Sequence, residues 1–451
     1  CAEQTISAAF PQIYLDQFMS LDADQSKKVK QNVESAITAL NKFSMSDGSF
    51  SLWPHGDRTD TWVTSYAGDF MIEAQKHGYI IPESLLNKWK SFQKKASNLY
   101  DPVQKILYQP NHGIDQAYRL YSMAQAGIAD LGAMNRLKEY PDLGINSKWR
   151  LGACYALIGQ SDIAKTLMTK TPDYSDYWES GHSYGSPLRD KAMVMETYLD
   201  AGDRGKAADM AIDISKSLNS ERPWNTQALA FTLKVLGKML GTSKDNKSDW
   251  KFNYKIGSMS QAVSSQTPTF IIDPKNASNA KSISIENTSS RPIYVQATMR
   301  SVPLTDTKES QSNNLSIDVK YSDDAGNSID PASITKGTNF KAEISVSNPN
   351  SLAKGYEHLA LNQIIPAGWE IINNRITEGD EDKASGYQYR DIRDDRVLTF
   401  FDLPPGKTKT FVIPLRASYQ GSYTLPAITC EEMYDGRVNA RAKGGVAIVS
   451  E

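Results

Sequence analysis

Residues 59–78 read TDTWVTSYAGDFMIEAQKHG, and this stretch decides how the first half of the chain folds. Its large or apolar positions recur every four residues, at Trp62, Tyr66, Phe70 and Ala74. That spacing places side chains on one face of an α-helix. Gly78 follows the last of them, and glycine is a common residue just past a helix end. The stretch therefore predicts an amphipathic helix that ends near Gly78.

The same helical period continues from Cys1 to about Gly241. The further runs are residues 20–43, 82–97, 115–127, 147–159, 189–203, 204–218 and 224–240. Gly, Asn, Pro or Asp separate them, which is the pattern of a loose repeat of helical pairs. Small residues such as Ala117, Ala153 and Ala228 suit helices that pack closely against two neighbours. Such pairs form either an open solenoid or a closed α/α toroid, and we expect the toroid, with the aromatic-rich connectors at one end.

The second half of the chain has a different period. After the polar linker GTSKDNKSDW (241–250), the apolar residues alternate with a period of two, which predicts β-strands. The segments are 268–274, 282–288, 292–299, 315–321, 340–348, 358–366, 397–403, 409–418 and 422–429. We expect antiparallel β-sandwich domains after the α/α toroid, in three parts: a helical domain at 1–248, a partial β segment at 249–303 and a complete sandwich at 304–451.

Composition excludes several classes of protein. Hydrophobic residues make up 40% and charged residues 23% of the 451 positions, as in ordinary soluble globular proteins. The net charge of −2 gives no electrostatic reason to expect nucleic acid as a partner. No apolar run approaches the ~20 residues that cross a bilayer, and no signal peptide is visible. The 3 cysteines and 5 histidines show no ligand spacing, so we expect no metal and no cofactor, and we expect Cys154 and Cys430 to be buried thiols.

The first four residues, Cys1-Ala2-Glu3-Gln4, can carry chemistry. A cysteine thiol and a glutamine amide three positions apart, in a tight turn at a helix start, can react with loss of ammonia to give an internal thioester. A thioester is an acyl donor that amines or hydroxyls attack. It must be kept from water until it is needed, so it requires a dry, shielded site.

These residues resemble the thioester motif of the bacterial α2-macroglobulins, relatives of the eukaryotic α2-macroglobulins and complement thioester proteins, where the motif is CGEQ or CLEQ. Residues 47–74, 185–194 and 224–231 resemble the helical thioester domain of that family. Residues 291–304, 344–371, 391–411 and 421–441 resemble its closing sandwich. The resemblance covers nearly the whole chain and corresponds to the carboxy-terminal part of the family's proteins.

The resemblance implies a broad-range protease inhibitor that traps proteases and acylates them through the thioester, a single-use trap rather than a turnover enzyme. A toroid inserted into a small CUB-like sandwich would explain the strand-poor segment at 249–303. The partners implied are target proteases, bound through lysine amines, and the macroglobulin domains that precede the thioester domain in the family and are absent here. The family also implies a periplasmic or cell-envelope location, with lipoprotein anchoring through the missing amino-terminal part as one option, and we expect a monomer.

Six further residues are candidates for helping the Cys1–Gln4 pair. Glu3 could hold the turn by hydrogen bonds, or it could be a first-turn acid favoured by the helix dipole. Met433 and Tyr434 match a Met-Tyr pair that covers the thioester in bacterial relatives; a local contact within the sandwich is the alternative. Phe50, Trp53 and Trp62 could wall the thioester pocket, although packing in the toroid core explains them more simply.

His112 is a candidate for acyl transfer. In complement relatives, a histidine about a hundred residues after the cysteine aids transfer to hydroxyls. The residues around His112 do not match that site, and an exposed loop histidine is the simpler interpretation. Without such a histidine, the thioester should prefer amines.

Two other functions remain open from the residues alone. Toroids followed by sandwiches also occur in carbohydrate-active enzymes, which would need paired carboxylates drawn from Asp57, Asp60, Glu179 and Asp190. Alternatively, Cys1 could be the lipidated first residue of a surface lipoprotein binding module. A free α-amine on Cys1 would also capture the acyl group by an S-to-N shift. We therefore expect Cys1 to be an artificial start and this chain to carry Cys1 and Gln4 unlinked.

Overall fold

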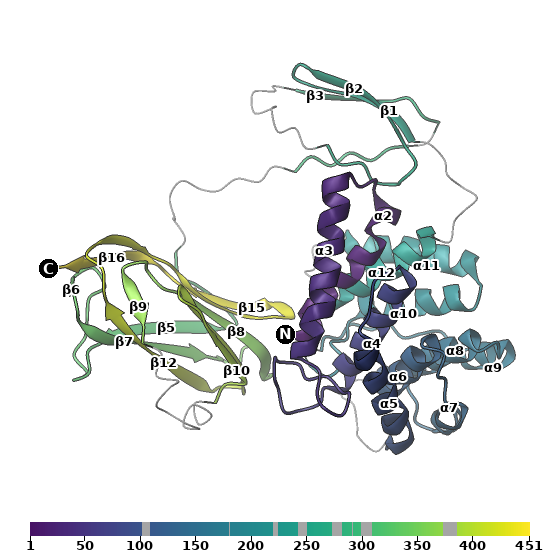
Figure 1. Cartoon of the computed structure of the whole chain (residues 1–451), viewed down its shortest axis with the longest axis horizontal. Coiled ribbons are helices and arrows are strands. Elements are labelled where there is room, and N and C mark those ends of the chain that lie inside the picture. Colours follow the sequence, from purple (N-terminus) through teal and green to yellow (C-terminus); the bar gives the residue numbers. More distant parts are fainter. Residues whose placement is uncertain are drawn as a thin grey trace. The chain divides into compact units, whose positions relative to one another are not determined.

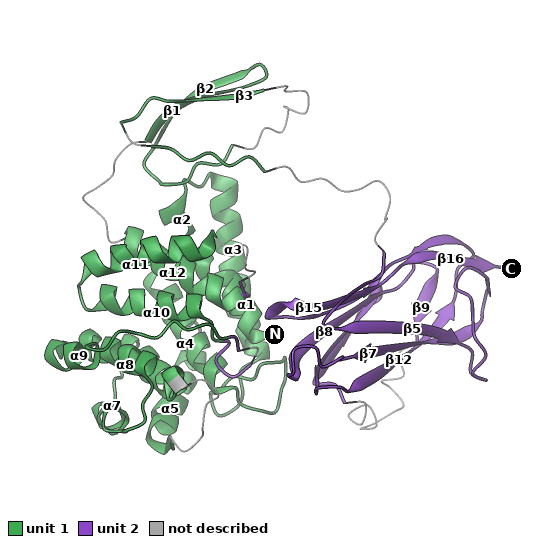
Figure 2. Ribbon diagram, turned by 180° about the vertical axis from the view of Figure 1, so that it is seen from behind, with its two compact units in different colours: residues 1–177, 185–222, 226–300 green, residues 178–184, 223–225, 301–451 purple. Residues whose placement is uncertain are grey.

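The computed structural model describes residues 1–101, 109–179, 181–219, 224–241, 250–272, 282–290, 292–298, 309–372 and 386–451. These divide into two compact units, which Figure 2 shows in different colours. Unit 1 comprises residues 1–177, 185–222 and 226–300; unit 2 comprises 178–184, 223–225 and 301–451. Each unit is described by itself.

Unit 1 begins with helices, as the sequence predicts (Figure 1). They are α1 (Ala2–Ala9), α2 (Leu15–Phe18), α3 (Ala23–Ala39), α4 (Thr61–Lys76), α5 (Glu83–Leu99), α6 (Ile114–Gln125), α7 (Leu131–Lys138), α8 (Ile145–Leu157), α9 (Ser161–Leu167), α10 (Pro187–Asp200), α11 (Arg204–Leu218) and α12 (Thr226–Gly241). Short 3₁₀ turns cover Phe10–Tyr14, Leu40–Lys42 and Gln109–Asn111. The stretch at residues 59–78 forms α4, and Gly78 follows the end of that helix with φ +86°.

The helices form a closed ring with an outer layer, which confirms the toroid. Successive contacts run from α1 to α4, α6, α8, α10 and α12, and α12 packs again on α1. Outside the ring, α3 packs on α1, α5 on α4 and α6, α7 on α6 and α8, α9 on α8, and α11 on α10 and α12.

The burial of each helix explains why it lies in the ring or in the outer layer. Helix α4 is buried at every position from Trp62 to Ala74, whereas α11 buries only Ala207 and Ile214. A helix buried on all sides belongs inside, and an amphipathic one outside.

Close helix contacts depend on small residues. A Cβ on Gly68 of α4 would lie 1.9 Å from Cζ2 of Trp89, the buried indole of α5. The Trp89 Nε1–H donates to the Thr64 carbonyl at 2.8 Å, so the ring cannot easily move away. Gly68 therefore sets how closely α5 approaches α4.

A network of charged side chains fills the centre of the ring. The Lys234 Nζ lies 2.6 Å from Asp69 Oδ2 and 2.9 Å from Glu196 Oε1, and Arg150 Nη2 lies 2.7 Å from Glu196 Oε2. Lys238 adds a further contact to Glu196 at 2.9 Å. Because these side chains come from α4, α8, α10 and α12, the network ties opposite sides of the ring together. Burial alone would raise the pKa of Glu196, but Lys234, Lys238 and Arg150 outweigh it and hold that pKa well below its usual range.

After the helices, unit 1 contains a three-stranded sheet in the order β2-β1-β3, built from β1 (Trp250–Ile256), β2 (Met259–Ser265) and β3 (Ile283–Asn287). The strands predicted at 268–274 and 292–299 are wrong for residues 268–272 and 292–298, which carry no strand apart from one bridge at Thr269. The hairpin of β1 and β2, closed by Gly257 at φ +57°, is an element that the sequence prediction missed.

Unit 2 is the predicted antiparallel sandwich. Its strands are β4 (Gln311–Asn313), β5 (Ser316–Ser322), β6 (Ile334–Thr335), β7 (Asn339–Ser347), β8 (Tyr356–Ile364), β9 (Trp369–Ile371), β10 (Tyr389–Ile392), β11 (Arg396–Leu403), β12 (Thr408–Ala417), β13 (Gly421–Leu425), β14 (Ile428–Glu432), β15 (Asp435–Ala442) and β16 (Gly445–Ser450). The sheets run β10-β11-β8-β14-β15-β4, β5-β7-β12-β9 and β13-β16-β6. Among the described residues of unit 2, the strands pair antiparallel except β16 with β6, and one isolated parallel bridge joins Asn314 to Asn439.

The core of the sandwich follows the period of two. In β7, Phe340, Ala342, Ile344 and Val346 point inward at alternate positions, and Phe411, Ile413 and Leu415 of β12 do the same. The run predicted as one strand at 422–429 forms two strands in different sheets, β13 and β14. Pro426 lies between them, and proline cannot continue a strand ladder.

Candidate functional site

The first turn of α1 contains Cys1 and Gln4, the pair predicted to react. Cys1 is the N-cap of the helix, and its Sγ accepts the backbone N–H of Gln4 at 3.4 Å. The Cys1 carbonyl accepts the N–H of Thr5 at 3.1 Å and its hydroxyl at 2.9 Å. The Ala2 N–H donates to the Leu52 carbonyl at 2.8 Å, so the connector after α3 is fixed beside this turn.

The two faces of α1 differ in exposure. Ala2, Glu3, Ile6 and Ser7 are buried, whereas Cys1, Gln4 and Thr5 are half-buried. The i, i+3 spacing of Cys1 and Gln4 places both on the same side of the first turn. The pair therefore lies at the edge of the buried interior, and the acidic residue between them points inward.

Glu3 is fully buried in a cluster of hydroxyl groups. Its Oε1 accepts a hydrogen bond from Ser7 Oγ at 2.5 Å, and its Oε2 accepts one from Thr226 Oγ1 at 3.4 Å. The Tyr66 hydroxyl lies 3.1 Å from Ser7 Oγ. Burial, and then the nearby Glu3 charge, raises the pKa of Tyr66 well above its ordinary value.

Sequence reasoning missed Ser7, Tyr66 and Thr226. Ser7 follows Glu3 by four residues on the same helix, a spacing that could have suggested contact. Thr226 is 223 residues away and Tyr66 lies 59 residues after Ser7, so no local pattern could have predicted their contacts.

The Cys1 α-amino group is also affected by its surroundings. Burial lowers the pKa of this amine, and the Glu3 charge acts in the opposite direction.

The three aromatic residues predicted as a pocket wall differ in burial and in their contacts. Phe50 is fully buried, and Trp62 is 2% exposed and packs in the ring against Tyr118 and Arg189, with centroid distances of 4.7 Å and 4.8 Å. Trp53 is half-buried and follows Leu52, whose carbonyl binds Ala2. Of the three, Trp53 is the one next in sequence to Leu52, which contacts the Cys1–Gln4 turn.

His112 differs from the exposed loop histidine that the sequence suggested, because it is only 7% exposed. Its Nδ1 lies 2.9 Å from the Asp142 carbonyl, and its ring packs on Tyr140 at 5.5 Å. The loop is held in the structure because the Gly144 N–H donates to the His112 carbonyl at 2.9 Å. A role in acyl transfer stays a prediction.

Met433 and Tyr434 form the two-residue turn between β14 and β15 in unit 2. The Met433 N–H donates to the His358 carbonyl at 3.2 Å. Tyr434 is 1% exposed, and its ring packs against Tyr184 at 4.7 Å and His358 at 5.8 Å. The local contact within unit 2 therefore exists, and the covering of a thioester stays a prediction.

Both later cysteines are buried, as the sequence predicts. Burial raises the pKa of the Cys154 thiol to about 12, and burial also raises that of Cys430. Thiols in such environments are poor nucleophiles. Within the described ranges, no group of three or more His, Cys, Asp and Glu side chains gathers as metal ligands.

Three of the four carboxylates considered for a carbohydrate-active enzyme make structural contacts, and the fourth, Asp57, is exposed. Asp60 caps α4 by accepting the Val63 N–H at 2.8 Å. Asp190 is buried, lies 2.7 Å from Arg189, and accepts hydrogen bonds from Asn111, Asn146 and Tyr177. Glu179 accepts a hydrogen bond from Ser183. These contacts argue against a catalytic pair.

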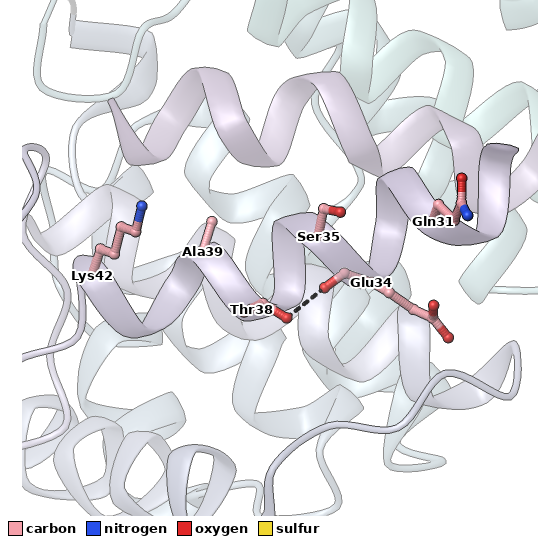
Figure 3. Close-up of a pocket in the computed structure, with 6 residues that line it drawn as sticks. All are labelled: Gln31, Glu34, Ser35, Thr38, Ala39 and Lys42. Atoms are coloured by element: carbon pink, nitrogen blue, oxygen red, sulfur yellow. Dashed lines mark hydrogen bonds between the residues drawn. The ribbon is translucent and has the colours of Figure 1, made fainter.

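Two surface hollows of unit 1 lie apart from the turn formed by Cys1–Gln4. One, of about 370 Å³, follows a single face of α3 and its end (Figure 3), lined by Gln31, Glu34, Ser35, Thr38, Ala39 and Lys42. A larger one, of about 1050 Å³, lies between α9 and the start of α11 over Trp149 and Tyr198. None of the candidate site residues lines either hollow.

Comparisons with known proteins match both halves of the chain. A family model described as the A-macroglobulin TED domain matches residues 1–129, and the bacterial α2-macroglobulin MG10 domain matches residues 315–436. The α2-macroglobulin of Pasteurella multocida is 23% identical over 98% of this chain and 24% of its own length; that of Escherichia coli is 23% identical over 96% and 27%.

Solved structures have the same fold. A Salmonella α2-macroglobulin reacted with methylamine aligns with a TM-score of 0.77 and 21% identity, over 100% of this chain and 30% of that one. An Escherichia coli α2-macroglobulin structure that spans domain MG7 to the carboxy terminus aligns with a TM-score of 0.76 and 20% identity, over 100% and 73%.

The ring of helices, with a Cys-x-x-Gln turn at its first helix and a sandwich of MG10 type later in the chain, defines a thioester-domain protein of the macroglobulin class. Two macroglobulin family models and curated α2-macroglobulins over nearly the whole chain match this sequence, which confirms the predicted resemblance to the bacterial α2-macroglobulin family. It spans about a quarter of the length of the curated relatives that it matches. No helix in the described ranges is long and apolar enough to cross a membrane.

Proposed function

We propose that this chain is the thioester-bearing part of a broad-range protease inhibitor, and that Cys1 and Gln4 form its thioester. The observation that carries the proposal is the geometry of the first turn. Cys1 Sγ lies 3.4 Å from the Gln4 backbone nitrogen, and both residues lie at the half-buried edge of the helix. The family resemblance supports the chemistry, because the TED model covers residues 1–129, which include this turn.

The proposed chemistry has two steps. In the first, the Cys1 sulfur attacks Gln4 Cδ, the C–N bond of the amide breaks, and ammonia leaves with the thiol proton. In the second, an amine of the trapped protease attacks Cδ, the C–S bond breaks, the electron pair stays on Cys1 Sγ, and the ammonium proton passes to water. Each molecule reacts once, so the protein acts as a covalent trap and not as a turnover enzyme.

The remaining parts of the proposal follow from the family. The target proteases are bound through lysine amines, with the upstream macroglobulin domains of the full-length protein as further partners, and the location is the periplasm or cell envelope. We retain the division into a toroid (1–248), a partial CUB-like segment (249–303) and a terminal sandwich (304–451). The exposed side chains of Ile271, Tyr294 and Val295, at 62%, 95% and 62%, are consistent with a segment that other strands complete.

The test uses the complete gene product that contains this chain. Mass spectrometry should show a peptide of residues 1–4 that is lighter by one ammonia, and methylamine should convert it into a methylamide at Gln4 that is heavier than the unmodified peptide by one methylene group. Cys1→Ser and Gln4→Glu should abolish both signals, whereas Gln31→Glu on the exposed face of α3 should not. A protease added to the protein should become covalently attached.

Three outcomes would contradict the proposal. They are an unmodified Cys1 and Gln4 in the complete protein, diacylglycerol on Cys1, or protease adducts that form equally well in Cys1→Ser.

A further inference from the structure

A small buried cavity lies between three inner helices of the ring, α6, α8 and α10. Its polar lining consists of Asn146 and Arg150 of α8 and of Asp190 and Thr197 of α10. Each residue that lines the cavity is at most 5% exposed. About 10 Å³ of the cavity is open to the centre of a water molecule. A single buried water needs about this much space, so the cavity has room for one water and not for an organic ligand.

Arg150 provides hydrogen-bond donors that the protein leaves without an acceptor. The residue is 1% exposed, and its Nη2 lies 2.7 Å from Glu196 Oε2. The N–H groups at Nε and Nη1 have no hydrogen-bond partner among the described residues. The guanidinium lies over the Tyr121 ring, 3.5 Å from its centroid, but this contact uses the face of the guanidinium, whereas its N–H bonds lie in the plane. Buried N–H groups are nearly always hydrogen-bonded, so these donors require an acceptor that is not part of the protein.

Two other lining side chains can accept hydrogen bonds from a water. The Thr197 hydroxyl donates to the Met193 carbonyl at 2.9 Å, which uses its proton and leaves its oxygen able to accept. Asn146 Oδ1 accepts the Asp173 N–H at 3.1 Å and retains a second lone pair. Together with an N–H of Arg150, these two oxygens provide three polar partners. Three is the usual number for a buried water.

The charges around the cavity favour a neutral occupant. Arg150 pairs with Glu196 at 2.7 Å, and Asp190 lies 2.7 Å from Arg189, so the cation and the carboxylate of the lining are each compensated. A chloride in the cavity would be repelled by the Asp190 carboxylate, and a metal cation would be repelled by the Arg150 guanidinium. Both repulsions are strong where water is excluded. A neutral molecule that donates and accepts hydrogen bonds avoids both.

We propose that this cavity is a binding site for a single ordered water molecule, which accepts a hydrogen bond from Arg150 and donates to Thr197 Oγ1 and Asn146 Oδ1. The inference is independent of the proposed function, because no residue of the Cys1–Gln4 turn lines the cavity.

The water connects two parts of the helical unit. On one side, Arg150 belongs to the charged network at the centre of the ring through its contact with Glu196. On the other side, Asn146 holds the connector after α9, because it donates to the Asp173 carbonyl at 2.9 Å and accepts the N–H of the same residue. Both contacts end at the cavity. The bound water therefore joins the centre of the ring to this connector by hydrogen bonds.

A crystal structure of the complete gene product, from crystals grown in sodium bromide, tests what occupies the cavity. We expect one water peak within hydrogen-bonding distance of an Arg150 N–H, Thr197 Oγ1 and Asn146 Oδ1, with no anomalous signal from bromine. A bromide ion at this position would overturn the proposal, because it would show an anion site. A cavity without density, at a resolution that shows other buried waters, would also overturn it.

Thr197→Val tests the same site in solution. Valine keeps the shape of the side chain, but it cannot accept a hydrogen bond from the water. The matched control is Thr166→Val on α9, because the Thr166 hydroxyl donates to the Asp162 carbonyl at 2.9 Å, the same contact on an exposed residue. We expect calorimetry to show a thermal midpoint of the helical unit that is about 2–4 °C lower in Thr197→Val than in Thr166→Val. This is the shift expected for one lost hydrogen bond in a unit of this size.

The opposite result has a clear physical meaning. In a dry cavity, replacing the buried Thr197 hydroxyl by a methyl group removes the cost of burying a polar group. Thr197→Val would then be as stable as Thr166→Val or more stable, and this result would overturn the proposal. If Thr197→Val does not fold, the crystal structure of the unaltered protein decides by the water and bromide criteria.

Discussion

The Lys234 ammonium lies 2.6 Å from the Asp69 carboxylate at the centre of the ring of helices, with side-chain exposures of 1% and 0%. Lys234 also lies 2.9 Å from Glu196, so one cation compensates two buried acids on α4 and α10. Replacing a buried ion pair by apolar residues can be neutral, whereas removing one partner leaves an uncompensated charge. The stability of the ring of helices therefore depends strongly on each charged side chain of this network.

Lys234→Ala should strongly destabilise the helical unit. The loss should be about 3–5 kcal/mol, because Asp69 and Glu196 would both lose their shared cation. Denaturant unfolding followed by tryptophan fluorescence measures it. Lys27→Ala, on the exposed face of α3, is the control and should change stability little. A loss equal to that of the control would show that the network contributes nothing to folding.

Acid should lower the free energy of unfolding of the helical unit, because it protonates the Glu73 carboxylate. Burial alone would raise the pKa of Glu73, but Lys238, Lys234 and Lys76 outweigh it and lower that pKa to about 2. Since the folded pKa lies below the ordinary value of 4.5, the stabilisation is fully present above about pH 4.5 and is lost as the pH falls toward 2. Glu73→Gln should therefore lose less stability than the unaltered chain over this range. Unfolding curves at a series of acidic pH values test this, and parallel losses in both proteins would refute it.

Two glycine-to-alanine substitutions should differ in their effect on stability. Gly68→Ala would place a Cβ 1.9 Å from the Trp89 ring, so we expect a loss of about 1–3 kcal/mol from overpacking. In Gly205→Ala, the new Cβ in α11 would meet only Asp203 at 3.8 Å. Alanine favours a helix by about 1 kcal/mol over glycine, so this variant should be neutral or stabilised. Thermal unfolding compares the two, and equal midpoints would contradict the assigned role of Gly68.

Tyr434→Ala tests the predicted cover of the thioester. If Tyr434 shields the thioester in the complete protein, its loss should speed methylamine uptake at Gln4. Tyr419→Ala, at a tyrosine of the same sandwich that is 57% exposed, is the control. Unfolding of both variants is measured in parallel, because removing a buried aromatic ring costs about 3–5 kcal/mol. Unchanged uptake in a folded Tyr434→Ala protein would leave only the local contact with Tyr184.

The chain that starts at Cys1 should carry Cys1 and Gln4 unlinked. A free amine on Cys1 can take the acyl group from its own sulfur, so a thioester there would be short-lived. Mass spectrometry of the 451-residue chain should give the full mass without loss of ammonia. A longer product in which Cys1 carried an amide in place of a free amine would show the loss. An intact thioester in the chain that starts at Cys1 would contradict this prediction.

The sequence predicted the fold best where one pattern persists over many residues. The stretch at 59–78 became α4 with its end at Gly78, and the alternation in 340–348 and 409–418 became β7 and β12. The sequence-based prediction failed where the formation of a strand depended on pairing with another strand. Residues 292–298 alternate like a strand but carry none, whereas the hairpin of β1 and β2 was missed although Phe252, Tyr254 and Ile256 alternate with polar residues.

The sequence by itself determined the chemistry that is local to one turn: Cys1 and Gln4 stand three residues apart at a helix start, and that spacing alone brings them to the same side. Only the tertiary structure decided what surrounds them. It buried His112, which the sequence suggested as exposed, and it brought Thr226 and Tyr66 to Glu3 across 223 and 63 positions of the chain. The physical reason is that contacts within a turn follow from backbone geometry, whereas contacts between distant helices exist only after the ring closes and excludes water.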